Sequence, residues 1–76
     1  MDTNEIQSRI ETAFKGCKAA ALDPRGSGDF FDVRISENDD LKNLSRVKKH
    51  QAIMKLFDEE VKSGEIHALA LKFITI

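Results

Sequence analysis

The chain has 76 residues, of which 41% are hydrophobic and 33% are charged, and its formal net charge at pH 7 is −1. This composition is typical of one small folded domain, residues 1–76, and the near-neutral charge argues against a protein that wraps nucleic acid over its whole surface. No apolar run approaches the roughly 20 residues that span a bilayer, and no signal peptide is visible, so we expect a protein that does not enter membranes. Cys17 has no partner for an internal disulfide, which favours the reducing cytoplasm.

The first expected element is a helix over residues 4–15. Its apolar residues recur with helical spacing, at Ile6, Ile10, Ala13 and Phe14. Thr3 or Asn4 can cap its start, because either side-chain oxygen can accept a bond from a free amide, and Gly16 ends it. The stripe continues to Cys17, which we expect to be a small buried side chain at the end of the helix.

Two short strands are expected next, over residues 18–23 and 30–36. Residues 23–29 between them form a turn rich in Gly, Ser and Asp, and no Gly-Lys-Ser/Thr sequence follows as in a phosphate-binding loop. Alternation in the second strand places three apolar side chains on one face, at Phe31, Val33 and Ile35. Phe30 falls on the other face, beside the loop.

A polar connection over residues 37–43 leads to a long helical stretch that Ser45 can cap and Gly64 ends. Its expected core-facing stripe consists of Val47, Ile53, Met54, Phe57 and Val61. One bent helix and two consecutive helices are both compatible with this pattern, and the sequence does not place a break.

The last expected element is a strand from Ile66 to Ile76, which is apolar on both sides and is therefore interior or covered by helices on one side. His67 at its start puts an imidazole at the edge of a sheet, where it can bind a metal or accept a proton. On these residues alone, a histidine that simply bonds a backbone carbonyl is the simpler explanation.

The element order α-β-β-α-α-β predicts an α+β fold. The two early strands form an antiparallel hairpin, and a right-handed helical crossover places the last strand parallel to the second. The result is a three-stranded mixed sheet with helices on one face, the arrangement of KH domains of the second topology (class II).

Several motifs resemble the BolA family over nearly the full length of the chain. They are Gly26-Ser27 in the loop, Phe31-Asp32-Val33 in the second strand, Ser45 to Gln51 and Glu59-Glu60 in the helical stretch, and Ile66 to Lys72 with Thr75 at the end. The helix and last-strand motifs are specific at this spacing, whereas the loop match alone is weak.

The resemblance implies a function and a cofactor. BolA-like proteins are partners of monothiol glutaredoxins, with which they hold a [2Fe–2S] cluster and take part in iron–sulphur trafficking or iron sensing. By this resemblance His67 is the cluster ligand of this chain, and the thiolates come from the glutaredoxin and glutathione; an imidazole in place of a thiolate is a known way to tune a cluster. We therefore expect an adaptor and not an enzyme, which alone is a monomer or a weak dimer.

The second ligand that the family usually offers is absent. It is a His or Cys just before the Phe-x-Val motif, and here that position is Phe30. Asp29, Ser27 and Cys17 are the substitutes: Asp29 is nearest but is a hard oxygen donor, while Cys17 is soft but lies at the end of the first helix. We expect partner binding to be retained, with the cluster ligated by His67 alone from this side or absent.

The alternative is a nucleic-acid-binding transcriptional regulator of stress and morphology, a role also described for BolA relatives. The candidate contact residues are Arg46, Lys48, Lys49, His50 and Lys55. Against DNA as a partner, the connection over residues 37–45 contains no glycine where a KH domain has its Gly-x-x-Gly loop, and it is acidic.

Overall fold

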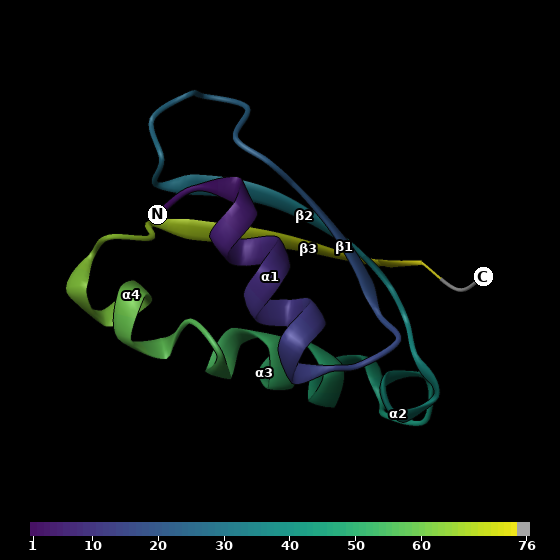
Figure 1. The fold of residues 1–76 in the computed structure, drawn as a ribbon. Coiled ribbons are helices and arrows are strands. Elements are labelled where there is room, and N and C mark those ends of the chain that lie inside the picture. The colour runs from purple at the N-terminus through teal and green to yellow at the C-terminus, as the bar shows by residue number, and fades with distance from the viewer. Residues whose placement is uncertain (75–76) are drawn as a thin grey trace.

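The computed structural model describes residues 1–74, which form a three-stranded sheet with helices on one of its faces (Figure 1). The elements are α1 (Thr3–Ala13), β1 (Lys18–Leu22), β2 (Phe30–Ser36), α2 (Asp39–Lys42), α3 (Arg46–Lys55), α4 (Asp58–Ser63) and β3 (Ala68–Ile74). β2 lies in the centre, antiparallel to β1 and parallel to β3. The expected α+β fold with a mixed sheet is confirmed.

The core lies between the sheet and the helices. Side chains with no exposed surface come from α1, β2, α2, α3 and the α3–α4 junction, at Ile6, Ile10, Phe31, Val33, Ile35, Leu41, Ile53 and Phe57. The alternation expected for β2 is confirmed, because its three core residues are fully buried while the intervening ones are not. A strand that presents one face to a core and one to solvent requires this pattern.

The start of α1 differs from the expectation. Its cap is Asp2, whose carboxylate accepts a bond of 2.8 Å from the amide of Glu5, so neither Thr3 nor Asn4 caps the helix. The helix also ends earlier than expected, at Ala13. An aspartate cap brings negative charge to the helix N-terminus, where the free amides attract it.

The polar connection contains a short helix, α2, that the sequence did not reveal. Asn38 caps it by accepting a bond of 2.8 Å from the amide of Leu41, and the Leu41 side chain is completely buried. Four residues are too few to show helical periodicity, so the only sequence signals were the cap and one leucine among polar neighbours.

The helical stretch is broken into α3 and α4 at Leu56 and Phe57. Ser45 caps α3 as expected, by accepting a bond of 3.2 Å from the amide of Lys48. At the break, Arg9 of α1 donates a bond of 3.0 Å to the carbonyl of Leu56, which has no partner further along the helix. Two consecutive helices are therefore the correct description.

The expected core stripe of these helices is partly wrong. Ile53 and Phe57 are buried, but Val47 is 65% exposed, Val61 is 37% exposed and Met54 is only half-buried. Val47 precedes Ile53 by six residues, which places the two side chains about 120° apart around the helix axis. Burying Ile53 therefore turns Val47 toward solvent.

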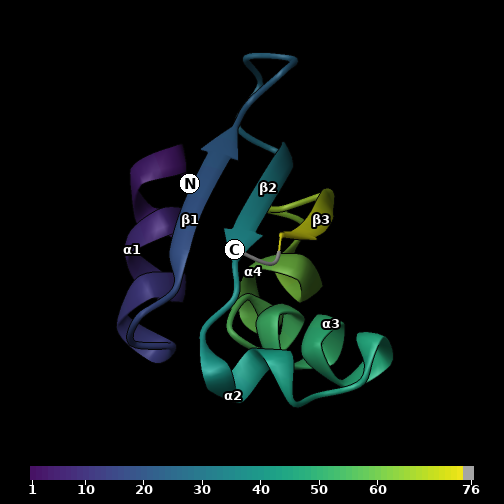
Figure 2. The same ribbon diagram turned by 90° about the vertical axis from the view of Figure 1, so that its right-hand side faces the viewer.

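β3 is an edge strand, and the helices cover only one of its faces (Figure 2). It begins one residue after His67, and none of its described side chains is fully buried. Thr75, the last residue of the motif that suggested the family, lies outside the described residues. Across residues 1–74, no helix is both long and apolar enough to cross a bilayer.

Candidate functional site

His67 lies in the short connection between α4 and β3. Gly64 ends α4 with a φ of 84°, a left-handed conformation that glycine adopts without strain. Ile66 then donates its amide to the carbonyl of Glu60 at 3.0 Å, and its side chain is 1% exposed. Because Ile66 is anchored in the core, the next side chain, His67, is turned outward and is exposed.

The backbone of His67 is held by the loop that precedes β2. The amides of His67 and Ala68 both donate to the carbonyl of Asp29, at 2.6 and 3.2 Å. Within residues 1–74 no hydrogen bond to the imidazole ring is present, so the backbone is fixed while the side chain is exposed. This combination of a fixed backbone and an exposed ring suits a ligand that meets a partner.

The structure brings Asp29 next to His67. Its carboxylate accepts a hydrogen bond from the Ser27 hydroxyl. That bond, assisted by the positive charge of His67 and Arg25, holds the pKa of Asp29 below its usual value. Of the substitutes considered for the second ligand, Asp29 and Ser27 therefore share the His67 end of the sheet.

Phe30 occupies the position at which the resemblance implies a second ligand. It pairs with Ala68 in the β2–β3 register, so it lies opposite the residue that follows His67. Its ring is half-buried and carries the guanidinium of Arg25 at 4.9 Å from the ring centroid. It belongs to the face of β2 that points away from the core.

Cys17 lies at the other end of the sheet. It directly precedes Lys18, which pairs with Ser36 at one end of β2, whereas Phe30 and the His67 region lie at the other end. A strand of this length spans about 20 Å. Cys17 is 3% exposed, and burial raises the pKa of its thiol, so its position does not allow it to share a metal with His67.

The described residues contain no group of three or more His, Cys, Asp or Glu side chains that could hold a metal ion. His67 is therefore a single imidazole donor with a carboxylate beside it. A carboxylate oxygen is a hard donor that is poorly matched to iron–sulphur chemistry. These residues fit a cluster only if the partner molecules supply the thiolates.

The basic residues of α3 do not form one surface. Arg46, Lys49 and His50 line a groove beside β3, whereas Lys55 lines grooves toward the acidic start of α4. Lys48 follows Arg46 by two residues, or about 200° around the helix axis. The five expected contact residues are thus divided between two sides of the helix.

Lys49 is also neutralised locally. Its ammonium forms an ion pair with Glu37, a buried carboxylate, and lies 5.3 Å from the ring centroid of Phe73. A cation engaged in this way supplies less attraction to an external phosphate than a free one.

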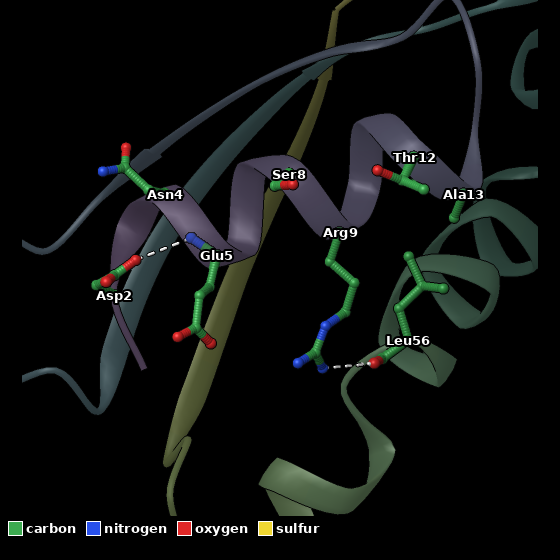
Figure 3. A pocket seen from close by; sticks show the side chains of 8 residues that line it. All are labelled: Asp2, Asn4, Glu5, Ser8, Arg9, Thr12, Ala13 and Leu56. Carbon is green, nitrogen blue, oxygen red and sulfur yellow. Dashed lines mark hydrogen bonds between the residues drawn. The ribbon is translucent and has the colours of Figure 1, made fainter.

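Arg9 is the structural residue that the sequence did not single out. Figure 3 shows it in a groove between α1 and the end of α3, where it donates to the carbonyl of Leu56. The same guanidinium donates to Glu60 at 2.7 Å and lies 5.1 Å from the ring centroid of Phe57. Glu60 in turn accepts the amide of Ile66, so this network connects the helix break with the His67 connection.

Comparisons with known proteins agree with this geometry. A family model described as "BolA-like protein" matches residues 7–76. The BolA domain of SufE1 from Arabidopsis thaliana is 28% identical, with a TM-score of 0.79, and the match covers 96% of this chain and 89% of that one. A search of curated proteins found no match.

Two further solved structures have the same fold. Yeast Fra2 is 27% identical with a TM-score of 0.67, and the match covers 99% of this chain and 80% of Fra2. The BolA1 protein from Mus musculus is 22% identical with a TM-score of 0.69, and the match covers 96% of this chain and 63% of that one.

Proposed function

This chain belongs to the family of BolA-like proteins, and we propose that it is an adaptor that binds a monothiol glutaredoxin and takes part in iron–sulphur cluster trafficking or iron sensing. The observation that carries the proposal is the exposed imidazole of His67 on a backbone fixed by the Asp29 carbonyl. Such a side chain can meet a partner without reorganisation of the chain behind it.

In this proposal His67 is the one ligand that the chain contributes to a shared [2Fe–2S] cluster, and glutaredoxin and glutathione contribute thiolates. When bound, such a cluster supplies one-electron redox chemistry or iron–sulphur cargo, and a histidine ligand shifts its potential. We assign Asp29 a positioning role, because an ionised carboxylate beside a ligating imidazole is suited to accept its second ring N–H.

The test is an anaerobic titration of the protein with a monothiol glutaredoxin and glutathione, followed by visible absorption. We expect a cluster spectrum that differs from that of the glutaredoxin alone and that is lost in His67→Ala. His50→Ala is the matched control, since His50 is exposed on α3. If neither the apo nor the iron-loaded glutaredoxin forms a complex, the adaptor proposal is wrong.

The nucleic-acid-binding role is the weaker alternative. It draws on the same basic residues, but Lys48 and Lys55 lie apart from Arg46, and the ammonium of Lys49 is paired with Glu37. Binding that falls steeply with added salt would favour this role, because phosphate contacts release counterions. The absence of binding at low salt would count against it.

A further inference from the structure

The two edges of the sheet differ in whether their outward backbone groups are hydrogen-bonded to the rest of the chain. On β1, the outward amides of Ala19 and Ala21 donate to side-chain oxygens of Glu11 and Gln7, each at 3.0 Å. Both acceptors come from α1, which packs along this strand. The edge at β1 is therefore closed, as proteins commonly do to prevent pairing with another chain.

The edge at β3 is open. The amide of Ala68 donates to Asp29 and the amide of Glu37 donates to Ile74, and these bonds fix which β3 groups face β2. By the parallel register, the backbone groups of every second residue point the other way; these residues are Leu69, Leu71 and Phe73. Within residues 1–74 no strand or side chain pairs with them, and Figure 2 shows β3 at the rim of the sheet.

A groove of about 450 Å³ runs beside this open edge, between β3 and α3. Its sides are formed by Leu71, Lys72 and Phe73 of the strand and by Arg46, Lys49 and His50 of the helix. Among the described residues that line it, the one carboxylate is that of Glu37, which is paired with Lys49. Arg46 and Lys72 are exposed, and neither forms an ion pair among the described residues.

We propose that the open edge of β3 binds an acidic peptide strand of a partner protein, which adds to the sheet and places its carboxylates against Arg46 and Lys72. Backbone bonds to the three free positions supply affinity in β-strand addition, and the groove supplies selection by charge. The site does not include the imidazole of His67, so peptide binding at β3 does not depend on whether His67 binds a cluster.

Two other occupants fit less well. A second copy of this chain would bring an identical basic groove to the same edge, and like charges across an interface disfavour the contact. A phosphodiester strand would satisfy the charges, but its backbone has no N–H donors for the outward carbonyls of Leu69, Leu71 and Phe73. A peptide supplies donors and acceptors in alternation.

The test uses the isotope-labelled full chain and a short capped peptide in which pairs of valines alternate with pairs of glutamates, observed by NMR. Two consecutive glutamates point to opposite faces of the added strand, so one can reach Arg46 and the other Lys72. We expect the amide signals of Leu69, Leu71 and Phe73 to shift and their hydrogen exchange to slow. The Arg46→Gln/Lys72→Gln double variant should bind the peptide about tenfold more weakly, as the loss of two exposed charge contacts predicts. The Lys48→Gln/Lys55→Gln variant is the matched control and should bind as the parent does.

A second peptide, N-methylated at every residue, distinguishes strand addition from simple charge attraction, since it keeps the carboxylates but has no amide N–H to donate along either edge. Loss of binding with this peptide supports the proposal. Equal binding of the methylated peptide, stronger binding of a single-stranded oligonucleotide, concentration-dependent shifts without any peptide, or no shifts at the three amides would each overturn it.

Discussion

At the scale of single residues, burial distinguishes two side chains that the sequence offered as candidate cluster ligands. His67 is exposed on a fixed backbone, whereas Cys17 is enclosed at the far end of the sheet. The sequence could show that the chain has one cysteine and where the histidine precedes a strand. It could not show that β2 separates them, because that distance depends on strand register.

Cys17 gives the first prediction at this scale. Burial raises the pKa of its thiol, so the folded protein holds less of the reactive thiolate at neutral pH. We expect the Cys17 thiol to react with a chromogenic disulfide, which releases a coloured thiolate, at least about tenfold more slowly in the folded chain than in the urea-unfolded chain. Equal rates in the two states would show that the thiol is accessible and would contradict the burial seen here.

Phe30 gives the second prediction at the scale of single residues. Phe30→His places an imidazole at the position of the family's usual second ligand, opposite the residue that follows His67. We expect a longer-lived cluster in the complex with glutaredoxin, measured by the decay of its visible absorption. Loss of the Arg25 contact should lower stability by about 0.5–1 kcal/mol.

The control is Phe30→Leu, which keeps an apolar side chain but offers no ligand. Its cluster lifetime should match that of the parent chain. A Phe30→His lifetime no longer than that of the leucine variant would show that this position does not reach the metal.

At the scale of elements, the break between α3 and α4 depends on a residue from a distant helix. Arg9 binds the carbonyl of Leu56, which directly follows α3, and the Glu60 side chain of α4. The hydrogen bond from Arg9 holds the pKa of Glu60 below its usual value. The stability from this pairing is therefore present above the pKa of glutamate in the unfolded chain, and is lost as the pH falls through the lowered pKa of the folded state.

We predict that Arg9→Gln lowers the free energy of unfolding at neutral pH and that the deficit narrows in acid, where Glu60 is protonated in either protein. Urea denaturation of both proteins at neutral and at acidic pH measures this difference in the free energy of unfolding. The pKa of Glu60, followed by NMR, should return toward its ordinary value. Lys62→Gln is the control, because the Lys62–Asp58 pair is exposed and contributes little; a deficit that does not change with pH would contradict the role of Glu60.

The elements also show what sequence patterns can reach. β2 was predicted with its bounds, because a strand with one buried face alternates at every residue. α2 was missed because four residues cannot display a period, and the break at Leu56 was not located because Arg9, which holds it, is remote in sequence. Val47 was misplaced because the seven-residue repeat it shares with Met54 runs beside the buried stripe and not along it.

At the scale of the whole molecule, the helices cover one face of the sheet and leave two surfaces accessible, the His67 connection and the basic groove beside β3. The His67 connection lies at the end of the sheet where β2 and β3 both begin. The basic groove lies along the edge of β3, toward the other end of that strand. A partner at one surface need not exclude a partner at the other. This separation is what allows the adaptor role and the strand-addition site to be tested independently.

The bond from His67 to the carbonyl of Asp29 also has a consequence for how the chain folds. It joins two segments separated by the whole helical crossover, and contacts of such long sequence separation generally form late. A chain that is still being synthesised, or that has opened locally, therefore has the histidine without its fixed backbone. Under the proposed adaptor function, iron would be received only by molecules that have completed their fold.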